Sequence, residues 1–134
     1  MLVRSARPED RAGIEAVQRA SPEASQWDPA GYDVTVAEIE GTVAGFLVTR
    51  RIVEEELEIL NLAVDPQHRR AGVARALIEP LMKAIRGDIF LEVRESNVTA
   101  QRFYQAIGFE EVSRRPAYYQ APPEGGIVMK FHSC

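Results

Sequence analysis

Hydrophobic positions along this chain recur with two different periods, and each period predicts one type of element. Alternation, or a short apolar run between turn-forming residues, is typical of strands, whereas apolar spacings of three and four are typical of helices. The first pattern predicts strands at residues 1–6, 34–39, 43–48, 57–64, 89–93, 109–113 and 127–131. The second predicts helices at residues 10–20, from about residue 71 to 86, and between a Ser96-Asn97 cap and Gly108.

Turn-forming residues separate these elements. Glu40-Gly41-Thr42 is expected to join the second and third strands as a hairpin, and the charged residues 50–56 are expected to be exposed. Residues 21–32 are predicted to be a loop around Trp27, whose side chain either seals the edge of the core or lines a substrate cleft. Gly87 is predicted to end the second helix, and residues 116–126 are predicted to form a loop between the last two strands.

The order of the elements predicts a topology. A strand, a helix and a strand in succession imply a right-handed crossover, so the strands at 57–64 and 89–93 are expected to be parallel neighbours. Pro80 falls in the middle of the connecting helix, where it removes one hydrogen bond and is expected to bend the axis. We therefore predict an α/β (α+β) fold in a single domain, residues 1–134, with a mixed, mostly antiparallel sheet and helices on both faces.

The strand at 57–64 leads into a loop with the features of a phosphate-binding site. Asp65-Pro66 ends the strand, and a basic segment precedes Gly72 at the start of the helix. The free N–H groups of that helix, from about Ala71 to Ala74, carry the positive end of the helix dipole, and small residues allow close approach. The neighbouring cations are Arg69, Arg70 and Arg75. This pattern predicts a pyrophosphate cradle.

Other phosphate-binding loops fit the sequence less well. A Walker loop needs Gly-Lys-Ser/Thr before its helix, and a dinucleotide fingerprint needs three spaced glycines where this stretch has only Gly72. An Arg-rich helix start that binds nothing is the remaining alternative.

The loop and a second motif resemble the GNAT superfamily of N-acetyltransferases. Arg69-x-x-Gly72-x-Ala74, after Leu62-Ala63-Val64-Asp65-Pro66, is similar to the acetyl-CoA loop of that superfamily. Leu91-Glu92-Val93-Arg94-x-Ser96-Asn97-x-x-Ala100-x-x-x-Tyr104-x-x-x-Gly108-Phe109 is similar to the matching half of its core. The resemblance covers roughly residues 34–131 and implies a GNAT fold with a splayed parallel strand pair and acetyl-CoA as co-substrate. The residues that it places at acetyl-CoA are Leu62, Ala63, Val64, Arg69, Arg70, Ala71, Gly72, Val73, Ala74, Arg75 and Asn97.

At finer grain, three segments resemble the ribosomal-protein-alanine N-acetyltransferases (RimI type). These segments are Asn61-Leu62-Ala63-Val64-Asp65-Pro66, Leu91-Glu92-Val93-Arg94 and the pair Tyr118-Tyr119. Such enzymes acetylate protein N-termini, including that of a small-subunit ribosomal protein, so the resemblance implies a protein or peptide N-terminus as acceptor. It gives Glu92 the general-base position and Tyr104 the general-acid position. The residues that it places at the acceptor are Trp27, Glu92, Tyr118 and Tyr119.

These residue types suit acetyl transfer. A free α-amine has a pKa near 7.7–8.0, so a carboxylate such as Glu92 is needed to accept its proton at neutral pH. A backbone N–H near Val64 is expected to stabilise the oxyanion, and Tyr104 to protonate the leaving thiolate. Each assignment has a structural alternative. Glu92 could face solvent, Tyr104 has the helical spacing of a core residue, and Arg114 and Arg115 either end a strand or attract an acidic group.

Composition limits the classes of partner and ligand that this chain is expected to bind. The 134 residues carry a net charge of −4, which argues against a general nucleic-acid binder, and no apolar run is long enough to span a membrane. Cys134 is the only cysteine, so no intrachain disulfide can form and a cytoplasmic location is expected. His68 and His132 are isolated in the sequence, so we expect no metal. We expect a monomer or a weak homodimer.

The chain departs from the RimI pattern in ways that affect the acceptor. The segment between Trp27 and Val34 is short, Pro116-Ala117 replaces the Arg-Asn that precedes the tyrosine pair, and Ala74 replaces the second glycine of the loop. The alternative acceptor is a small amine such as a polyamine or an antibiotic. A regulatory module that binds CoA and does no chemistry is a third hypothesis.

Overall fold

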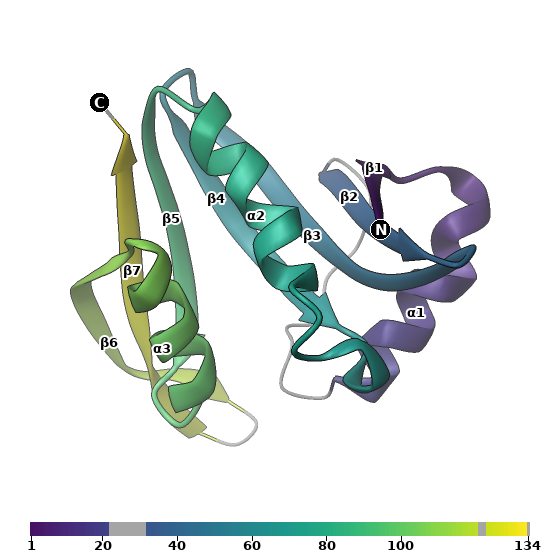
Figure 1. The fold of residues 1–134 in the computed structure, drawn as a ribbon. Coiled ribbons are helices and arrows are strands. Elements are labelled where there is room, and N and C mark those ends of the chain that lie inside the picture. The colour runs from purple at the N-terminus through teal and green to yellow at the C-terminus, as the bar shows by residue number, and fades with distance from the viewer. Residues whose placement is uncertain (22–31, 121–122, 134) are drawn as a thin grey trace. The chain divides into compact units, whose positions relative to one another are not determined.

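Each predicted strand and helix has a counterpart in the structure (Figure 1). The computed structural model describes residues 1–21, 32–120 and 123–133, and of residues 117–120 the backbone. The strands are β1 (Leu2–Ser5), β2 (Asp33–Ile39), β3 (Thr42–Val53), β4 (Glu56–Val64), β5 (Gly87–Arg94), β6 (Glu110–Gln120) and β7 (Pro123–Ser133). The α-helices are α1 (Arg11–Ala20), α2 (Val73–Ala84) and α3 (Val98–Ile107), and short 3-10 helices are η1 (Pro8–Asp10) and η2 (Pro66–His68).

The strands form a mixed sheet in the order β1-β2-β3-β4-β5-β7-β6. Neighbours are antiparallel at β1–β2, β2–β3, β5–β7 and β7–β6. The exception is β4 beside β5, which run in the same direction and are joined in the chain by α2. At their starts the Asp88 N–H donates to the Glu55 carbonyl over 2.9 Å. The predicted mixed sheet with a parallel central pair is confirmed.

The chain forms two compact units. The first consists of Met1–Arg50 and Ile59–Ala84, and the second of Arg51–Glu58 and Ile85–Cys134. Strand β4 contributes residues 56–58 to the second unit and residues 59–64 to the first. The basic loop after β4 therefore belongs to the first unit, whereas Glu92, Asn97 and Tyr104 belong to the second.

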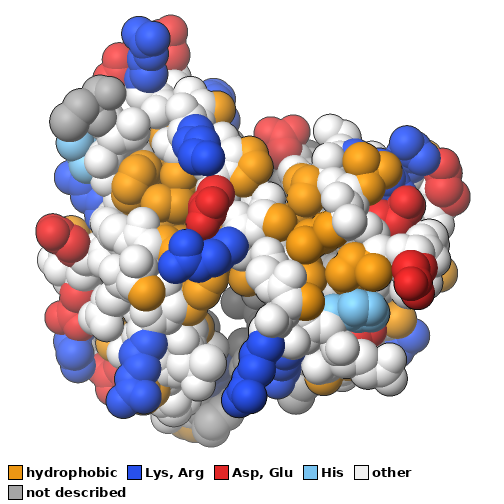
Figure 2. All heavy atoms as spheres, in the orientation of Figure 1, with side chains coloured by type: hydrophobic (Ala, Val, Ile, Leu, Met, Phe, Trp, Pro, Cys, Tyr) orange, Lys and Arg blue, Asp and Glu red, His pale blue; other side chains and the backbone are white. Residues whose placement is uncertain are grey.

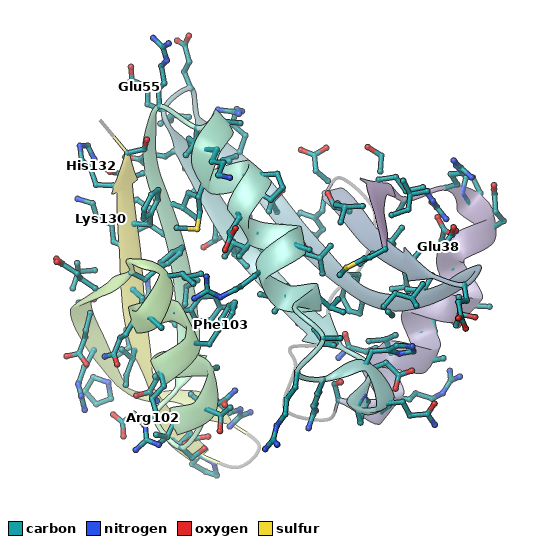
Figure 3. All side chains as sticks on the ribbon, in the orientation of Figure 1. Glu38, Glu55, Arg102, Phe103, Lys130 and His132 are labelled. Carbon is teal, nitrogen blue, oxygen red and sulfur yellow. The ribbon has the colours of Figure 1, made fainter. Side chains whose placement is uncertain are left out.

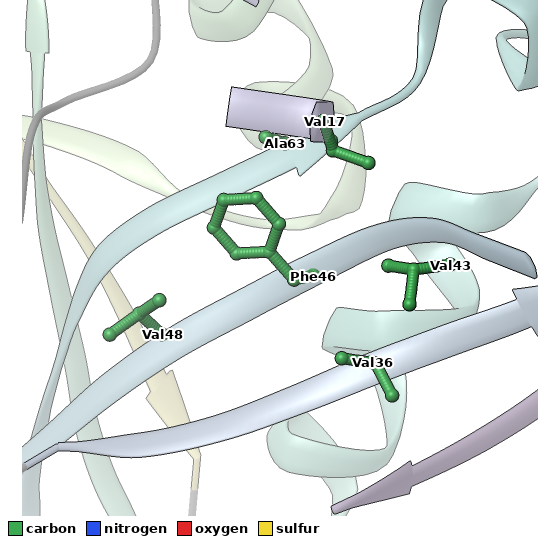
Figure 4. Close-up of a cluster of buried hydrophobic side chains, with 6 residues drawn as sticks. All are labelled: Val17, Val36, Val43, Phe46, Val48 and Ala63. Atoms are coloured by element: carbon green, nitrogen blue, oxygen red, sulfur yellow. The ribbon is translucent and has the colours of Figure 1, made fainter. Parts of the chain in front are cut away.

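Strand β3 is the centre of the first unit. Its residues 43–49 are buried without interruption because helices cover both faces of the strand. Val17 of α1 joins Phe46 in the buried cluster on one face (Figure 4). Helix α2 packs on the other face, where a Cβ added at Gly45 would lie only 2.9 Å from Val73 Cγ1. Burying a side chain such as Phe46 contributes about 1.5–3 kcal/mol.

The hairpin between β2 and β3 forms as predicted. Glu40 and Gly41 both have positive φ values, 51° and 78°, and the flanking residues Ile39 and Thr42 are paired. This is the two-residue turn whose twist matches that of the strands. The charged segment that follows is exposed as expected, but residues 50–53 continue β3 because Ile52 and Val53 are strand formers.

The second unit is built on the antiparallel strands β5, β7 and β6. Ile89, Leu91 and Val93 alternate as buried residues along β5. Helix α3 packs on this face through aromatic contacts, with ring centroids 5.4 Å apart for Tyr104–Phe109 and 5.7 Å for Phe109–Phe131. The predicted caps of α3 are both present. Asn97 Oδ1 accepts from the Ala100 N–H over 3.2 Å, and Gly108 ends the helix with a φ of 115°.

Two predicted boundaries were wrong. Helix α2 ends at Ala84, not at Arg86, because Gly87 is required in β5. Gly87 has a φ of 141°, and its backbone passes so close to the Glu55 carbonyl that a Cβ would collide with that oxygen. Pro80 lies inside α2, as predicted, and on its exposed side.

The predicted loop at residues 116–126 is mostly strand. Residues 116–120 continue β6 and residues 123–126 begin β7. Pro116 is accommodated because it lies at a register shift between Arg115 and Tyr119 on an edge strand. At Gly125 a Cβ would lie 3.2 Å from the Arg115 carbonyl oxygen and would displace the end of the Glu95 side chain. Among the described residues, no helix is long and apolar enough to cross a bilayer.

A buried ion pair fixes the N-terminal end of the first unit. The two terminal nitrogens of Arg4, Nη1 and Nη2, donate to the Asp10 carboxylate over 2.7 and 2.9 Å. Nη2 also donates to Glu38 over 2.9 Å (Glu38 is labelled in Figure 3). Asp10 additionally accepts the Arg7 N–H over 2.7 Å. This network connects β1, η1 and β2, and Asp10 is only 7% exposed.

The Arg4–Asp10 pair predicts a specific loss of stability in acid. The hydrogen bonds from Arg4 lower the pKa of Asp10 from 3.8 to about 2. A carboxyl group with a lower pKa in the folded state stabilises the fold above its unfolded pKa, and that stabilisation is lost as the pH falls from about 4 towards 2. It amounts to about 2 kcal/mol. Urea unfolding of Asp10→Asn should therefore give a lower midpoint at pH 7 and a smaller change between pH 5 and 2.5 than the wild type.

Glu15→Gln is the matched control for this measurement. The Arg11–Glu15 pair, at 3.1 Å, is exposed on α1, so its loss should change stability by less than about 0.5 kcal/mol. An Asp10→Asn variant with the acid sensitivity of the wild type would contradict the assignment.

Candidate functional site

The end of β4 is held by a capped turn. The Asp65 N–H donates to the Ala44 carbonyl over 2.8 Å, and Asp65 Oδ1 accepts the Gln67 N–H over 3.0 Å. The strand therefore stops where Asp65-Pro66 predicted, and η2 turns the chain towards α2. Because the Asp65 N–H is already engaged, it does not serve as the oxyanion donor expected near Val64, and the N–H of Val64 itself stays a prediction.

The loop before α2 has an open backbone. Arg70 and Gly72 both adopt positive φ values, 65° and 78°. The first hydrogen bond of the helix runs from the Ala76 N–H to the Gly72 carbonyl, at 3.0 Å, so the N–H groups of Val73, Ala74 and Arg75 precede the helical ladder. A Cβ added at Gly72 would meet no atom within 4 Å. The helix starts at Val73, slightly later than predicted.

Cations surround this helix end. Arg69, Arg70 and Arg75 are all exposed, and Lys and Arg side chains project at this loop on the face seen in Figure 2. Arg75 Nη1 lies 3.0 Å from Glu79 Oε1, so part of its charge is neutralised within α2. N–H groups that precede the helical ladder, the helix dipole and exposed arginines are features of an anion site, and the predicted pyrophosphate cradle stays a prediction.

Residues 62–64 of β4 differ in what they can offer a ligand. Ala63 belongs to the buried cluster with Val17 and Phe46, so its side chain faces α1. Leu62 and Val64 lie on the opposite face of the strand and are half-buried. The Val64 carbonyl accepts a hydrogen bond from Ser21 Oγ over 3.3 Å. Only Leu62 and Val64 can therefore present side chains on the α2 face.

Glu92 lies on β5 on the face opposite α3. Ile89, Leu91 and Val93 face α3, so strand alternation turns Glu92 the other way, together with Asp88 and Arg94. The Glu92 side chain is 19% exposed, and its Oε1 lies 3.2 Å from Arg115 Nε. That contact lacks hydrogen-bond geometry. Within the described part of the chain, the buried Oε1 atom has no hydrogen-bond donor. The Glu92 side chain is therefore on the face away from α3, where it is partly buried, and the choice between a catalytic and a solvent-facing Glu92 stays a prediction.

The other charged residues on this face of β5 have partners on β7. Asp88 Oδ1 lies 2.5 Å from His132 Nδ1, and Asp88 Oδ2 lies 3.7 Å from Lys130 Nζ; Lys130 and His132 are labelled in Figure 3. Arg94 Nη1 contacts Glu124 Oε1 at 3.0 Å. These pairs leave Glu92 as the carboxylate of this face with an unfilled acceptor atom among the described residues.

Glu124 is a residue that the sequence did not single out. It accepts hydrogen bonds from Arg94, from the Ser96 N–H at 3.1 Å and from Ser96 Oγ at 3.0 Å. It thereby fixes the turn between β5 and α3. The Arg94–Glu124 contact depends on strand residues that the sequence predicted to be loop, so no local pattern indicated it.

Tyr104 lies on the other side of β5, on α3. Its ring packs edge-to-face on Phe103 and Phe109, and the residue is 8% exposed. Burial raises the pKa of its hydroxyl above the ordinary value of 10.0, so the phenol stays protonated at neutral pH. The structure therefore makes Tyr104 a core residue, as its spacing suggested, and a functional role for its hydroxyl stays a prediction.

Of the remaining predicted site residues, the structure describes the side chain of Asn97 but not those of Trp27, Tyr118 and Tyr119. Asn97 uses Oδ1 as the cap of α3, which leaves its amide NH₂ group for a ligand. Trp27 lies outside the described residues, as do the side chains of Tyr118 and Tyr119. The described residues contain no group of three or more His, Cys, Asp or Glu suited to a metal ion, and the expectation of no metal stays a prediction.

Comparison with known proteins supports one family. The model of the acetyltransferase (GNAT) family matches residues 3–109. The [Ribosomal protein bS18]-alanine N-acetyltransferase of Escherichia coli (strain K12) is 41% identical over 95 residues, which are 66% of this chain and 64% of that protein. The match thus spans less than two thirds of that relative. N-alpha-acetyltransferase RimI of Mycobacterium tuberculosis is 28% identical over 117 residues, 78% of this chain and 74% of that protein.

Solved structures share the fold. The ribosomal-protein-S18-alanine N-acetyltransferase of Escherichia coli superposes with a TM-score of 0.80 and 27% identity, covering 99% of this chain and 95% of that one. Ard1 of Thermoplasma volcanium gives a TM-score of 0.82 and 27% identity, covering 96% and 95%.

The open loop predicts that acetyl-CoA binding depends on Gly72. Gly72→Glu should abolish the 1:1 binding of acetyl-CoA in calorimetry, because a carboxylate there would fill the open space and repel phosphate. Gly72→Ala should bind within a few-fold of the wild type, since a Cβ meets no atom. Gly41→Glu is the control for backbone strain, because Gly41 has the same φ of 78° in the β2–β3 turn. Undiminished binding by Gly72→Glu would remove this loop from the site.

Proposed function

This chain belongs to the acetyltransferase (GNAT) family, and on that basis we propose that it transfers the acetyl group of acetyl-CoA to the N-terminal α-amine of a protein. The observation that carries the proposal is the Glu92 carboxylate, which is largely buried on β5 and has an acceptor atom without a hydrogen-bond donor among the described residues. The side chain keeps 19% of its surface exposed, and through this exposed part the carboxylate can accept a proton from an incoming nitrogen, directly or through a water.

Glu92 is proposed as the general base. An α-amine with a pKa near 7.7–8.0 is mostly protonated at pH 7 and must lose a proton to attack. In the overall reaction the N–C bond forms and the thioester C–S bond breaks. The nitrogen gives one proton to Glu92, directly or through a water, and the sulfur receives one from Tyr104. Solvent then restores both residues, so no covalent enzyme intermediate is required.

Direct transfer places a geometric requirement on Glu92 and Tyr104. Within the second unit, Glu92 lies on one face of β5 and α3 packs on the other face with Tyr104. The nitrogen and the sulfur are bonded to the same carbon in the tetrahedral intermediate, so the proposal requires that the polar ends of both side chains reach this one carbon. Because burial raises the pKa of Tyr104 and keeps its hydroxyl protonated, we propose that the hydroxyl first donates a hydrogen bond to the departing sulfur and then transfers its proton.

The loop before α2 is proposed to hold the co-substrate. When bound, acetyl-CoA supplies the acetyl group as an activated thioester. The N–H groups of Val73, Ala74 and Arg75 would face its pyrophosphate, with Arg69 and Arg70 as counter-charges. Asn97 is proposed to contact the same ligand through its amide NH₂ group.

The acceptor is proposed from the relatives. The Escherichia coli relative is named for alanine acetylation of ribosomal protein bS18, and the Mycobacterium tuberculosis relative is an N-alpha-acetyltransferase. We therefore propose a protein N-terminus, with a ribosomal protein as the first candidate, and a cytoplasmic location. Trp27, Tyr118 and Tyr119 are proposed to contact the acceptor. A monomer or a weak homodimer, no membrane association and no direct nucleic-acid binding complete the proposal.

A peptide comparison tests the acceptor. A lysine amine has a pKa near 10.4, about 2.5 units above an α-amine, so presenting it neutral costs roughly 3.4 kcal/mol more, partly offset by greater nucleophilicity. With thiol release as the readout, a lysine-free peptide with a free N-terminal alanine should react at least about tenfold faster than its N-blocked counterpart with one lysine. Equal rates would contradict the N-terminal assignment. Polyamines in the same panel test the small-amine alternative, and binding of acetyl-CoA without turnover on any amine would indicate a regulatory module.

The pH dependence tests the base. Glu92→Gln should lower kcat strongly at pH 7 and less at pH 9, because the amine loses its proton unaided at high pH. Tyr104→Phe is the comparison, since it should slow turnover across the whole range while acetyl-CoA affinity stays within a few-fold. A Glu92→Gln deficit that does not change with pH would argue against the general-base role.

A further inference from the structure

We infer that Arg115 is a positioning residue for Glu92, which holds the carboxylate and favours the neutral form of the bound acceptor amine. The inference rests on the proposed function of Glu92. Its basis is the 3.2 Å contact between Arg115 Nε and the buried Glu92 Oε1.

The sheet explains how Arg115 reaches Glu92. Arg115 is on β6, which is separated from β5 by β7. The β7 residue paired with Arg115 is Gly126, which is also paired with Arg94 of β5. Because Gly126 has no side chain, nothing projects from β7 at this point of the register, and a long Arg side chain can cross β7 to the neighbouring strand.

The other charges on this face make Arg115 the counter-ion of Glu92. Arg94 is already bound to Glu124, and Glu124 is further satisfied by the N–H and hydroxyl of Ser96. Arg114 is bound to Glu111 through two hydrogen bonds, at 2.9 and 3.1 Å. Arg115 in turn is paired with Glu92.

A guanidinium beside the base affects the acceptor. A carboxylate alone would hold the acceptor as its ammonium ion, because opposite charges attract, and an ammonium ion cannot attack. A permanent positive charge at 3.2 Å from the same carboxylate opposes a second cation there and lowers the pKa of the bound amine. The Nε contact also limits the rotation of the Glu92 side chain by holding the buried Oε1, and it leaves the other carboxylate oxygen to accept the proton.

The experiment compares the pH profiles of kcat for a lysine-free peptide with a free N-terminal alanine. In Arg115→Gln, the bound ammonium ion is no longer opposed, so the acidic limb of kcat should move to higher pH by about 0.5–1 unit. At pH 6.5, kcat should fall about three- to tenfold while KM stays equal or falls, and at pH 9 kcat should approach the wild-type value. Arg115→Lys keeps the charge and should retain the wild-type limb.

Arg114→Gln is the matched control, because Arg114 is the neighbouring arginine on β6 and is paired with Glu111. Its profile should match the wild type. A fluorescence titration of the peptide at pH 6.5 gives a second readout, in which Arg115→Gln should bind as tightly as the wild type or several-fold more tightly.

Three results would overturn the inference. A uniform loss of kcat in Arg115→Gln at all pH values, or a limb shift of equal size in Arg114→Gln, would leave Arg115 a structural role only. If the wild type acetylates the peptide and Glu92→Gln shows its expected pH dependence, either of these two results would contradict the positioning role of Arg115 and leave the proposed function intact. A wild type that acetylates no peptide N-terminus would overturn both.

Discussion

The alternation of side chains along β5 is the constraint on which the chemistry of the second unit depends. Ile89, Leu91 and Val93 must be buried against α3, and burial of three such side chains outweighs any preference of the residues between them. Glu92 is therefore turned to the opposite face, away from the aromatic contacts of Tyr104. A shift of one residue in the β5–β7 register would bury the charged set and expose the apolar one. The hydrophobic packing of α3 thus places the carboxylate.

Glycines in β3, β5 and β7 allow neighbouring groups to approach the strands closely. Gly45 allows α2 to pack on β3, and Gly87 allows β5 to start against the Glu55 carbonyl. Gly125 makes room for Glu95, and Gly126 leaves a gap in β7 between Arg94 and Arg115. At Gly45, Gly87 and Gly125 a Cβ would lie within 3.0 Å of a neighbouring atom. The presence of glycine at these positions is explained by tertiary contacts rather than by local turn formation.

Two ion pairs in this chain differ in whether the carboxylate oxygens accept hydrogen bonds. In the first unit, Arg4 and the Arg7 N–H satisfy both oxygens of Asp10, and the result is a rigid connection between β1, η1 and β2. In the second unit, Arg115 contacts Glu92 without forming a hydrogen bond, and among the described residues the buried oxygen keeps its acceptor site. A satisfied carboxylate stabilises a fold, whereas an unsatisfied one retains the capacity to take a proton.

Local sequence determined the element types, the hairpin turn at Glu40-Gly41, the stop at Asp65-Pro66 and the caps of α3, because each depends on neighbours within a few residues. The open backbone at Gly72 was predictable for the same reason. The sequence did not determine where β6 and β7 end, since Pro116 and Gly125 are typical of loops and only pairing across the sheet makes them strand residues. The contacts of Glu92 with Arg115 and of Arg94 with Glu124 join residues more than twenty positions apart in the chain. Only strand pairing brings them together, so the tertiary structure alone decided the surroundings of the proposed base.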